Sequence, residues 1–345
     1  MDAENLQSKF LGEGSYGCVV KPPVKCKNKV QLRKEKKKEV LVGKIFTNKD
    51  SFKKEIIANQ NIINIDKKGD KLLSATSYCS INGKELKNIN RVKSCEFKHK
   101  NIIDKNQPLY QLNMPYGGMT LKEYLKLNKY NINIYDILKL LVNIFKILIL
   151  LEKKKMCHQD IKPDNILIKP SNESTLIDYG LMIPYDKIYN VFNRHRLKYS
   201  YYPYPPEYKF FEFIYFQKCY KYEYCNYIYN NFINSRSSSS QINHTLNILF
   251  SQNDVRNIII NKVNNLIEHD KNKTIENYMI KYSNKVDVFS LGMTIVKILK
   301  YINYNFEDDY VNTFIRNLIH PDFNIRYSPK EALNNLKILL KKIKN

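Results

Sequence analysis

The feature that most constrains this chain is a short polar stretch that runs into an apolar one, CHQDIKPDN-ILI at residues 157–168. Asp160 is followed two residues later by Lys162 and five residues later by Asn165, and Asp178-Tyr179-Gly180 begins 13 residues after Asn165. Phosphoryl transfer from ATP needs a carboxylate to orient the attacking hydroxyl, a cation on the moving phosphate and oxygen ligands for Mg²⁺. The stretch supplies each residue type on a loop that enters a strand, so it predicts a phosphoryl-transfer site.

A second pattern lies near the N-terminus, where Gly12, Gly14 and Gly17 form GEGSYG between two apolar segments. It predicts a strand, a glycine turn and a second strand, which is a hairpin whose backbone can approach phosphates. The alternative is the start of a dinucleotide-binding fold, which needs a helix after the third glycine. A β-branched pair and then Lys21-Pro22-Pro23 follow instead, and the prolines block a helix. The dinucleotide-binding alternative is therefore rejected.

An apolar strand at residues 40–46 contains a single lysine, Lys44. A lysine inside a short buried strand is costly unless an acid pairs with it. Glu55 stands eleven residues later in a helix-like segment and is the natural partner. Glu35 and Glu39 also lie nearby in the sequence, so a surface role for Glu55 stays open.

Helical patterns are frequent in the chain after residue 120. The most apolar run, residues 134–151, is interrupted by four polar side chains, which favours a buried helix over 134–154 rather than a membrane span. A further strong helix begins near Val286, and two more follow it. A serine run at 235–240 predicts a flexible loop between these parts.

The seven cysteines, at positions 18, 26, 79, 95, 157, 219 and 225, form no CxxC pair and are odd in number. This pattern argues against a zinc site and against a disulfide framework, and it favours reduced thiols in a cytosolic setting. Residues 1–9 are polar and lack the apolar core of a signal peptide, so we expect no secretory leader.

The net charge of +24 favours acidic partners, either nucleic acid or acidic protein substrates. Lysine, asparagine, isoleucine and tyrosine are all abundant, however, as an AT-rich genome would produce. No regular basic stripe stands out, arginine is scarce, and no nucleic-acid-binding motif accompanies the charge. Compositional drift is the favoured explanation, and nucleic-acid binding is kept as an alternative.

These segments, in this order, resemble the eukaryotic-type protein kinase family over about residues 8–340. Lys162, two residues after the acid, resembles the serine/threonine branch. The resemblance implies an α+β, bilobal fold with a small β-rich N-lobe at 1–112 and a hinge and larger, mainly helical C-lobe at 113–345. About 80 residues separate Glu207 from Asp287, more than the family needs, so we expect an insertion at about 208–280.

The resemblance also implies roles for the residues of the polar stretch and of the Asp-Tyr-Gly turn. Asp160 would orient the substrate hydroxyl and take its proton, and Lys162 would steady the γ-phosphate. Asn165 and Asp178 would hold Mg²⁺, and the family's phosphate donor is ATP. The substrate would be a protein that carries serine or threonine, with acidic surroundings suggested by the charge of this chain.

Nucleotide contacts carry over from the family in the same way. Lys44, fixed by Glu55, would grip the α- and β-phosphates, and adenine would meet backbone groups near 113–115. Pro115 has no N–H, which leaves the hinge donor uncertain by one residue. The expected ATP-binding residues are Leu11, Gly12, Glu13, Gly14, Ser15, Gly17, Val19, Val42, Lys44, Glu55, Asn113, Met114 and Leu167. Three further matches are structural: Glu207 with Arg326 as a buried ion pair, and Asp287 as the anchor of the catalytic loop.

Several departures from the family pattern bear on regulation. Gln159 replaces the arginine that reads a phosphate on the activation loop, so we expect activity without that phosphate. Tyr179 replaces phenylalanine, Phe289 stands where tryptophan is usual, and Ser200 stands near the position of a common threonine. The composition and the insertion look like kinases of large cytoplasmic DNA viruses, with a protist as the other source.

Three other functions are alternatives to a protein kinase. A pseudokinase or scaffold module would lack a site lysine, aspartate or asparagine, and none is missing. A small-molecule kinase is disfavoured by the Lys162 spacing and by Pro206-Glu207, and a basic nucleic-acid-binding protein is the third alternative. We expect a monomer without membrane attachment, located in the cytoplasm, or in the virion if the source is viral.

Overall fold

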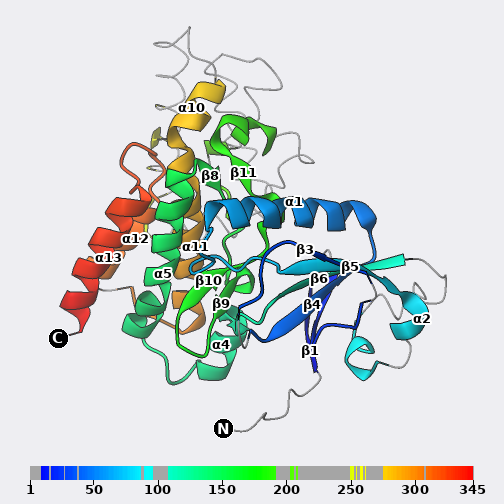
Figure 1. Ribbon diagram of the computed structural model, residues 1–345. Helices are drawn as coiled ribbons and strands as arrows, with labels where there is room; N and C mark the ends of the chain where they lie inside the picture. Colours follow the sequence, from blue (N-terminus) through cyan, green and yellow to red (C-terminus); the bar gives the residue numbers. More distant parts are fainter. Residues whose placement is uncertain are drawn as a thin grey trace. The chain divides into compact units, whose positions relative to one another are not determined.

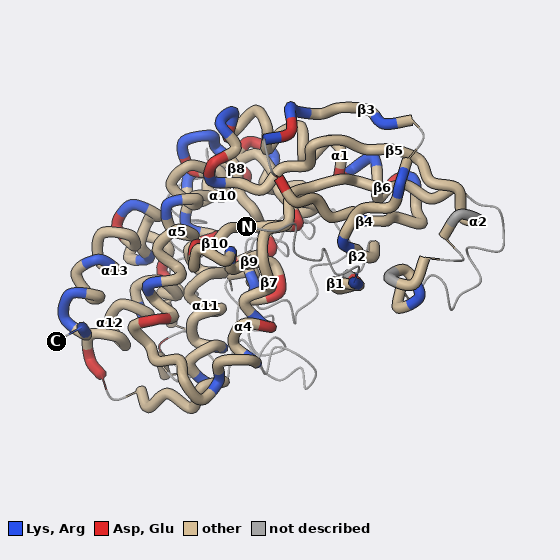
Figure 2. The backbone as a smooth tube through the Cα atoms, turned by 60° about the horizontal axis from the view of Figure 1, so that its bottom comes forward, with Lys and Arg blue, Asp and Glu red and all other residues tan. Residues whose placement is uncertain are grey.

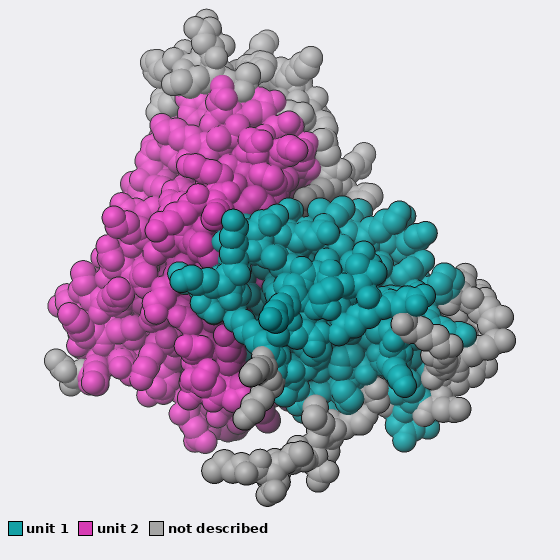
Figure 3. Space-filling model, viewed as in Figure 1, with its two compact units in different colours: residues 1–118 teal, residues 119–345 magenta. Residues whose placement is uncertain are grey.

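The computed structural model describes residues 9–14, 17–26, 28–36, 39–86, 89–95, 108–191, 203–205, 207–208, 249–251, 254, 257–258, 261, 275–306 and 308–344. The chain divides into two compact units, Met1–Gly118 and Met119–Asn345, which are described separately (Figure 3). Ser15, Ser200, Pro206 and most of the expected insertion, with its serine run and its aromatic residues, lie outside the described residues.

Unit 1 is built on a six-stranded antiparallel sheet with the order β1-β2-β4-β6-β5-β3. The strands are β1 (Lys9–Gly14), β2 (Gly17–Lys21), β3 (Lys29–Gln31), β4 (Leu41–Phe46), β5 (Ser77–Asn82) and β6 (Pro108–Pro115). The hairpin expected around the glycine pattern and the strand expected at 40–46 are confirmed. β3 is exposed at the edge of the sheet, as its charged sequence indicates.

Helix α1 (Lys49–Ile65) packs on one face of this sheet (Figure 1). It begins at Asn48, whose side chain accepts a hydrogen bond from the N–H of Ser51, one of the donors that a helix start leaves unpaired. Phe52 anchors the contact, because its ring stacks on Tyr110 of β6 with centroids 4.8 Å apart and also packs on Phe46 of β4. α2 (Gly83–Leu86) and η1 (Asn90–Val92) contribute to a separate apolar cluster with residues of β2, β4 and β5.

Two disulfides cross unit 1, and they overturn the expectation of reduced thiols for these four cysteines. Cys18 bonds to Cys95 with Cα atoms 5.8 Å apart, and Cys26 bonds to Cys79 with Cα atoms 6.0 Å apart. Both separations lie in the normal range for a disulfide. The partners are 77 and 53 residues apart in sequence, so it is packing in one apolar cluster and not local spacing that brings them together. The cysteine argument for a cytosolic setting therefore fails.

Unit 2 is mainly helical. α4 (Leu121–Asn128) begins with a capping box between Thr120 and Glu123, as the sequence suggests. α5 (Ile134–Lys153) is the expected buried helix, with nine buried apolar side chains. Within the described part of the chain, every helix is too short or too polar to span a bilayer.

Short strands of unit 2 flank the loops that carry the polar residues singled out from the sequence. β7 (Met119–Thr120), β9 (Ile166–Ile168) and β10 (Ser174–Leu176) form one small sheet, and β8 (Met156–Cys157) pairs with β11 (Ile183–Pro184). η2 (Pro163–Asn165), η3 (Tyr179–Leu181) and η4 (Tyr185–Val191) are single 3₁₀ segments next to these strands.

The remaining described helices of unit 2 are α10 (Ile275–Tyr282), the short η5 (Ser283–Lys285), α11 (Val286–Tyr301), α12 (Asp309–Leu318) and α13 (Pro329–Ile343). α11 starts where the sequence predicts it and is almost wholly buried. α10 lies at the end of the expected insertion, and its Met279 packs in one apolar cluster with Cys157, Tyr208 and Val286. The segment expected to end the insertion therefore contributes to the core of unit 2.

Candidate active site

The polar stretch forms the loop between β8 and β9, and it brings Asp160 and Lys162 together. Lys162 Nζ lies 2.9 Å from Asp160 Oδ1 and 3.0 Å from Oδ2, so the cation spans the carboxylate. Asp160 is buried and Lys162 is about a quarter exposed, at 27% of its side chain. A buried carboxylate with a partly exposed cation on it is suited to handling a substrate hydroxyl and a phosphate that arrive from outside.

Asn165 and Asp178 lie at the same end of the β9–β10 hairpin. Ile166 pairs with Leu176, and the N–H of Ile177 donates to the Asn165 carbonyl at 3.0 Å, which puts Asn165 opposite the residue before Asp178. The Asn165 amide nitrogen donates to the Asp160 carbonyl at 2.9 Å, so the orientation of the amide leaves Oδ1 as the oxygen able to bind a cation.

Asp178 occupies the left-handed region, at φ 65° and ψ 73°, immediately before η3. A residue other than glycine rarely takes this conformation, and such strain is concentrated at functional sites. No group of three or more His, Cys, Asp or Glu side chains that could hold a metal ion occurs among the described residues. An amide oxygen and one carboxylate fit Mg²⁺, which takes few protein ligands and completes its shell with phosphate and water oxygens.

Asp287 of α11 anchors the loop between β8 and β9 through two hydrogen bonds to its backbone. Its Oδ2 accepts the N–H of His158 at 2.6 Å and its Oδ1 accepts the N–H of Gln159 at 2.9 Å. Burial raises the pKa of the Asp287 carboxyl, and the two N–H donors partly oppose that shift. The expected anchoring role is consistent with this geometry, because one side chain satisfies two buried backbone donors next to Asp160.

His158 joins the loop to the strand that leads to Asp178. The N–H of Asp160 lies 3.3 Å from His158 Nδ1, and His158 Nε2 lies 3.2 Å from the carbonyl of Ile177. A backbone N–H can only donate, so Nδ1 is the acceptor and Nε2 carries the proton that is donated to Ile177. The imidazole thus ties the backbone of Asp160 to that of Ile177.

Gln159, the residue in place of the family's arginine, is fully buried and has positive φ (70°). Its amide nitrogen donates to the hydroxyl of Tyr208 at 3.1 Å. Tyr208 was not singled out from the sequence, and no local pattern marks it as a partner 49 residues away. The position therefore holds a neutral, internally satisfied side chain.

In unit 1, Lys44 of β4 pairs with Glu55 of α1, as predicted. Nζ lies 3.3 Å from Oε1, and the two side chains are 13% and 5% exposed. The competing acids are engaged elsewhere, since Glu35 pairs with Lys29 at 2.5 Å and Glu39 with Arg33 at 3.0 Å. The alternative of a surface role for Glu55 is thereby excluded.

Gly12 and Gly14 lie on β1 and Gly17 begins β2, with Gly14 paired to Gly17 and Gly12 to Val19. At Gly17 a Cβ would stand only 2.3 Å from the Ile45 carbonyl oxygen, so only glycine fits against β4. At Gly12 nothing lies within 4 Å of that position. Leu11 and Glu13 lie on β1, with Leu11 partly buried and Glu13 exposed, and Ser15 is outside the described residues.

Val19 and Val42 share a face of the sheet with Lys44. Val19 is the cross-strand partner of Lys44, and Val42 stands two residues before it on β4, where side chains return to the same face. Met114 is the cross-strand partner of Val42 and lies on that face too. Leu167 belongs to unit 2, where it is buried in β9 between Thr175 and Thr120.

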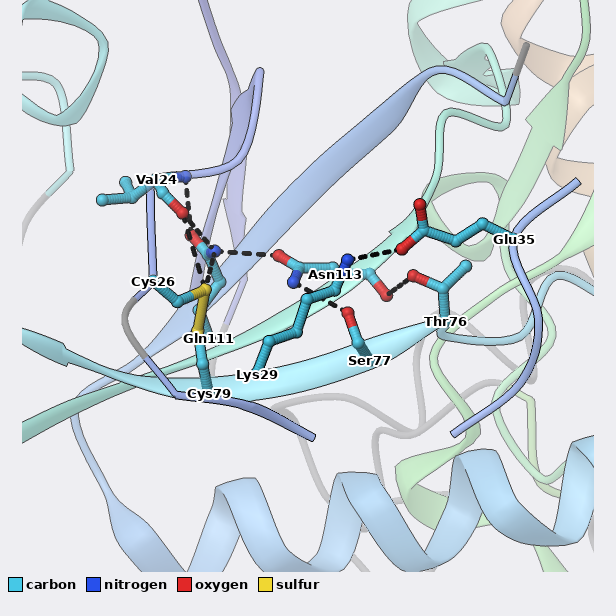
Figure 4. The surroundings of a disulfide bond; sticks show 9 residues. All are labelled: Val24, Cys26, Lys29, Glu35, Thr76, Ser77, Cys79, Gln111 and Asn113. Atoms are coloured by element: carbon cyan, nitrogen blue, oxygen red, sulfur yellow. Dashed lines mark hydrogen bonds and ion pairs between the residues drawn. A yellow bond between two sulfur atoms is a disulfide. The ribbon is translucent and has the colours of Figure 1, made fainter. Parts of the chain in front are cut away.

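Asn113, an expected hinge residue, makes more hydrogen bonds inside unit 1 than a hinge residue is expected to make. Its carbonyl accepts the N–H of Thr76 at 2.8 Å, and its amide nitrogen donates to Ser77 Oγ at 2.9 Å. Its Oδ1 accepts from Gln111, whose amide also bonds both backbone groups of Val24 beside the Cys26–Cys79 disulfide (Figure 4). Thr76 Oγ1 also donates to the Asn113 carbonyl, at 3.3 Å, so that oxygen already accepts two hydrogen bonds, and a nucleotide contact at Asn113 stays a prediction.

Two ion pairs of unit 2 complete the surroundings of the loop. Arg326 is fully buried and makes a bidentate pair with Glu207, at 2.7 and 3.0 Å, while its guanidinium lies 4.8 Å from the Phe289 ring centroid. Phe289 thus still supplies an aromatic face where tryptophan is usual. Lys122 pairs with Asp164 at 2.8 Å on the surface, a contact 42 residues apart that the sequence did not indicate.

The loop thus has a buried aspartate, a lysine on its carboxylate and an asparagine beside them, and it is held by an acid from a helix. This arrangement is compatible with the phosphoryl-transfer site that the sequence predicts. A family model described as protein tyrosine and serine/threonine kinase matches residues 6–256, more than half of the 345-residue chain. The chain therefore belongs to the protein tyrosine and serine/threonine kinase family, whose bilobal fold joins a β-sheet region to a helical region and whose members generally use ATP and Mg²⁺. A search of curated proteins found no match.

Proposed function

We propose that this protein kinase transfers the γ-phosphoryl group of ATP to serine or threonine hydroxyls of proteins. The observation that carries the proposal is the contact of Lys162 Nζ with both carboxylate oxygens of Asp160. A lysine two residues after the catalytic acid is typical of the serine/threonine branch of the family, which the family match alone does not separate from the tyrosine branch.

Asp160 would accept a hydrogen bond from the substrate hydroxyl and take its proton as the new O–P bond forms. Lys162 would stabilise the negative charge that develops on the transferred phosphoryl group. Because the loop is held by Asp287 and His158, these groups need little rearrangement when the substrate binds, which is how positioning and electrostatics lower such a barrier.

Asn165 Oδ1 and Asp178 would hold Mg²⁺, and Lys44 with Glu55 would hold the α- and β-phosphates of ATP. The ion, when bound, neutralises charge on the phosphate oxygens. The remaining nucleotide contacts are proposed at Leu11, Gly12, Glu13, Gly14, Ser15, Gly17, Val19, Val42, Asn113, Met114 and Leu167.

The test is an autophosphorylation and peptide-phosphorylation assay with Mg²⁺ and ATP, comparing the wild type with Asp160→Asn. We expect at least about a thousandfold loss of kcat in the variant, about 4 kcal/mol in barrier height, with unchanged nucleotide binding. Phosphoserine and phosphothreonine among the products support the proposal, and phosphotyrosine alone would overturn the branch assignment. Nucleotide binding without transfer in the wild type would instead identify a pseudokinase.

We infer an N-lobe at 1–112, a hinge and C-lobe at 113–345 and an insertion at about 208–280, and we expect a monomer that acts on acidic protein substrates. A viral source rests on the composition and the insertion alone. A cytoplasmic location, or a virion location, is also a proposal, and the two disulfides count against a reducing compartment.

A further inference from the structure

The exposed side of α5 carries a regular line of lysines. Of its 20 residues only three are exposed, and these are Lys139, Lys146 and Lys153. They stand seven residues apart, which is close to two helical turns, so they form one stripe with about 10 Å between neighbours. The sequence suggested no regular basic stripe, because the buried residues between these lysines hide their alignment.

Helix α13 shows the same bias. Its exposed residues include Lys330, Lys337, Lys341 and Lys342. Its single acid, Glu331, lies in the first turn and is engaged with the backbone N–H and hydroxyl of Ser328, at 2.7 and 2.8 Å. The exposed face of α13 beyond its first turn is therefore purely basic in its charged residues.

α5 and α13 pack against each other and run side by side in Figure 1, and Figure 2 marks basic residues in blue along both. We call their seven exposed lysines the two-helix lysine surface: Lys139, Lys146, Lys153, Lys330, Lys337, Lys341 and Lys342. Among the described residues, none of the seven has an acidic side chain within ion-pair distance. Their nearest recorded contacts are neutral, such as Asn143 for Lys146 and the ring of Tyr310 for Lys342.

The exposed side of a mostly buried helix needs polar residues, but these need not all be lysines. Glutamines, or acidic residues alternating with lysines, would serve equally well. Alternating charges would also add stabilising pairs four residues apart along each helix. The three lysines of α5 instead repel one another at spacings of about 10 Å, which is near the screening length of physiological salt. That arrangement raises the local positive potential, which favours a polyanion.

We propose that the two-helix lysine surface binds the phosphate backbone of nucleic acid without sequence preference. Lysine contacts a phosphate as a point charge and does not provide the bidentate fork with which arginine reads bases. An anionic membrane is a poorer fit, because a helix that lies in a membrane interface inserts an apolar face. The apolar side chains of α5 are in the core, and on α13 the only exposed apolar residue is Ile338.

The experiment measures fluorescence anisotropy of a labelled duplex DNA of about 20 base pairs, and of a single-stranded RNA, over a series of KCl concentrations. The test variant is Lys139→Gln/Lys146→Gln/Lys153→Gln. The matched control is Lys53→Gln/Lys54→Gln/Lys67→Gln, which removes the same charge from exposed positions on or just after α1.

We expect the α5 variant to bind nucleic acid at least about tenfold more weakly at low salt. The slope of log K against log salt concentration should fall by the equivalent of about two to three phosphate contacts. The affinity of the control variant should change by less than about twofold. Equal loss in both variants would show diffuse charge and overturn the proposal, as would binding to phosphatidylserine vesicles without binding to either nucleic acid. Peptide phosphorylation by both variants should match the wild type, which separates this result from the proposed catalytic function and verifies folding.

Discussion

The side-chain amide of Gln159 donates a hydrogen bond to the hydroxyl of Tyr208 at 3.1 Å, and both residues are buried. Tyr208 directly follows Glu207, which is fixed by its bidentate pair with Arg326. In kinases that this chain resembles, an arginine at the position of Gln159 reads a phosphate on the activation loop. Here the position is neutral and its amide is already bonded inside unit 2, so a phosphate has no cation to meet there.

Phosphatase treatment of the purified protein should therefore leave its peptide-phosphorylation rate within about twofold of the untreated rate, under 0.5 kcal/mol in barrier height. The measurement is initial rate before and after treatment, with removal of phosphate verified by mass spectrometry. Tyr208→Phe tests the structural role, because it removes the buried hydroxyl that bonds to the Gln159 amide and should cost about 1 kcal/mol of stability. A large loss of activity after dephosphorylation would contradict the interpretation of Gln159.

Lys44→Met should lower kcat/KM for ATP by about a thousandfold, and Glu55→Gln by a smaller factor of about ten to a hundred. Lys44 itself would contact phosphate, whereas Glu55 only positions Lys44 and a neutral amide can still accept its hydrogen bond. Both residues are nearly buried, so removing one charge takes a close ion-pair partner from the other and also costs stability.

Thermal denaturation separates the two effects in this pair. Lys44→Met/Glu55→Leu removes both charges and should recover much of the melting temperature lost in Lys44→Met, while the activity stays low. Recovery of activity together with stability would mean that Lys44 has only a structural role.

Sequence patterns predicted those parts of the fold and site that depend on neighbours along the chain. The glycine hairpin, the Lys44–Glu55 pair and the helix at 134–153 all follow from local periodicity or from the cost of a buried charge. Contacts between distant segments could not be predicted in this way, because no local pattern records them. The Cys18–Cys95 bond and the Gln159–Tyr208 bond are of that kind.

Reduction should destabilise unit 1, because both disulfides close long loops within it. In the chain-entropy description a loop of 77 residues is worth about 4 kcal/mol, and the nested 53-residue loop adds less than its separate value. We expect a clear fall in melting temperature on adding a phosphine reductant, which converts each disulfide to two thiols. Non-reducing peptide mapping should recover the cross-linked pairs from the untreated protein.

The matched variant replaces Cys18, Cys26, Cys79 and Cys95 by serine, and its melting temperature should not respond to the reductant. Cys157 stays outside this comparison, because it is buried and burial raises the pKa of its thiol, so it reacts slowly while the protein is folded. An equal melting temperature for the wild type with and without reductant, with the thiols verified as free, would contradict the prediction.

Lys122→Ala should increase the preference for a basic residue next to the phosphorylated serine. Asp164 lies in the polar stretch, four residues after Asp160, and its carboxylate is 2.8 Å from Lys122 Nζ. The hydrogen bond and the charge of Asp164 raise the pKa of Lys122, so the lysine stays cationic and competes with a basic substrate for this carboxylate. The pair is exposed, and such pairs are worth at most about 1 kcal/mol, so the preference for the basic peptide should increase by about two- to fivefold.

The measurement is the ratio of kcat/KM for two peptides that differ by one lysine. Lys122→Arg should behave as the wild type, and Lys122→Ala/Asp164→Asn should lose the increased preference. An unchanged ratio in Lys122→Ala would exclude Asp164 from substrate selection.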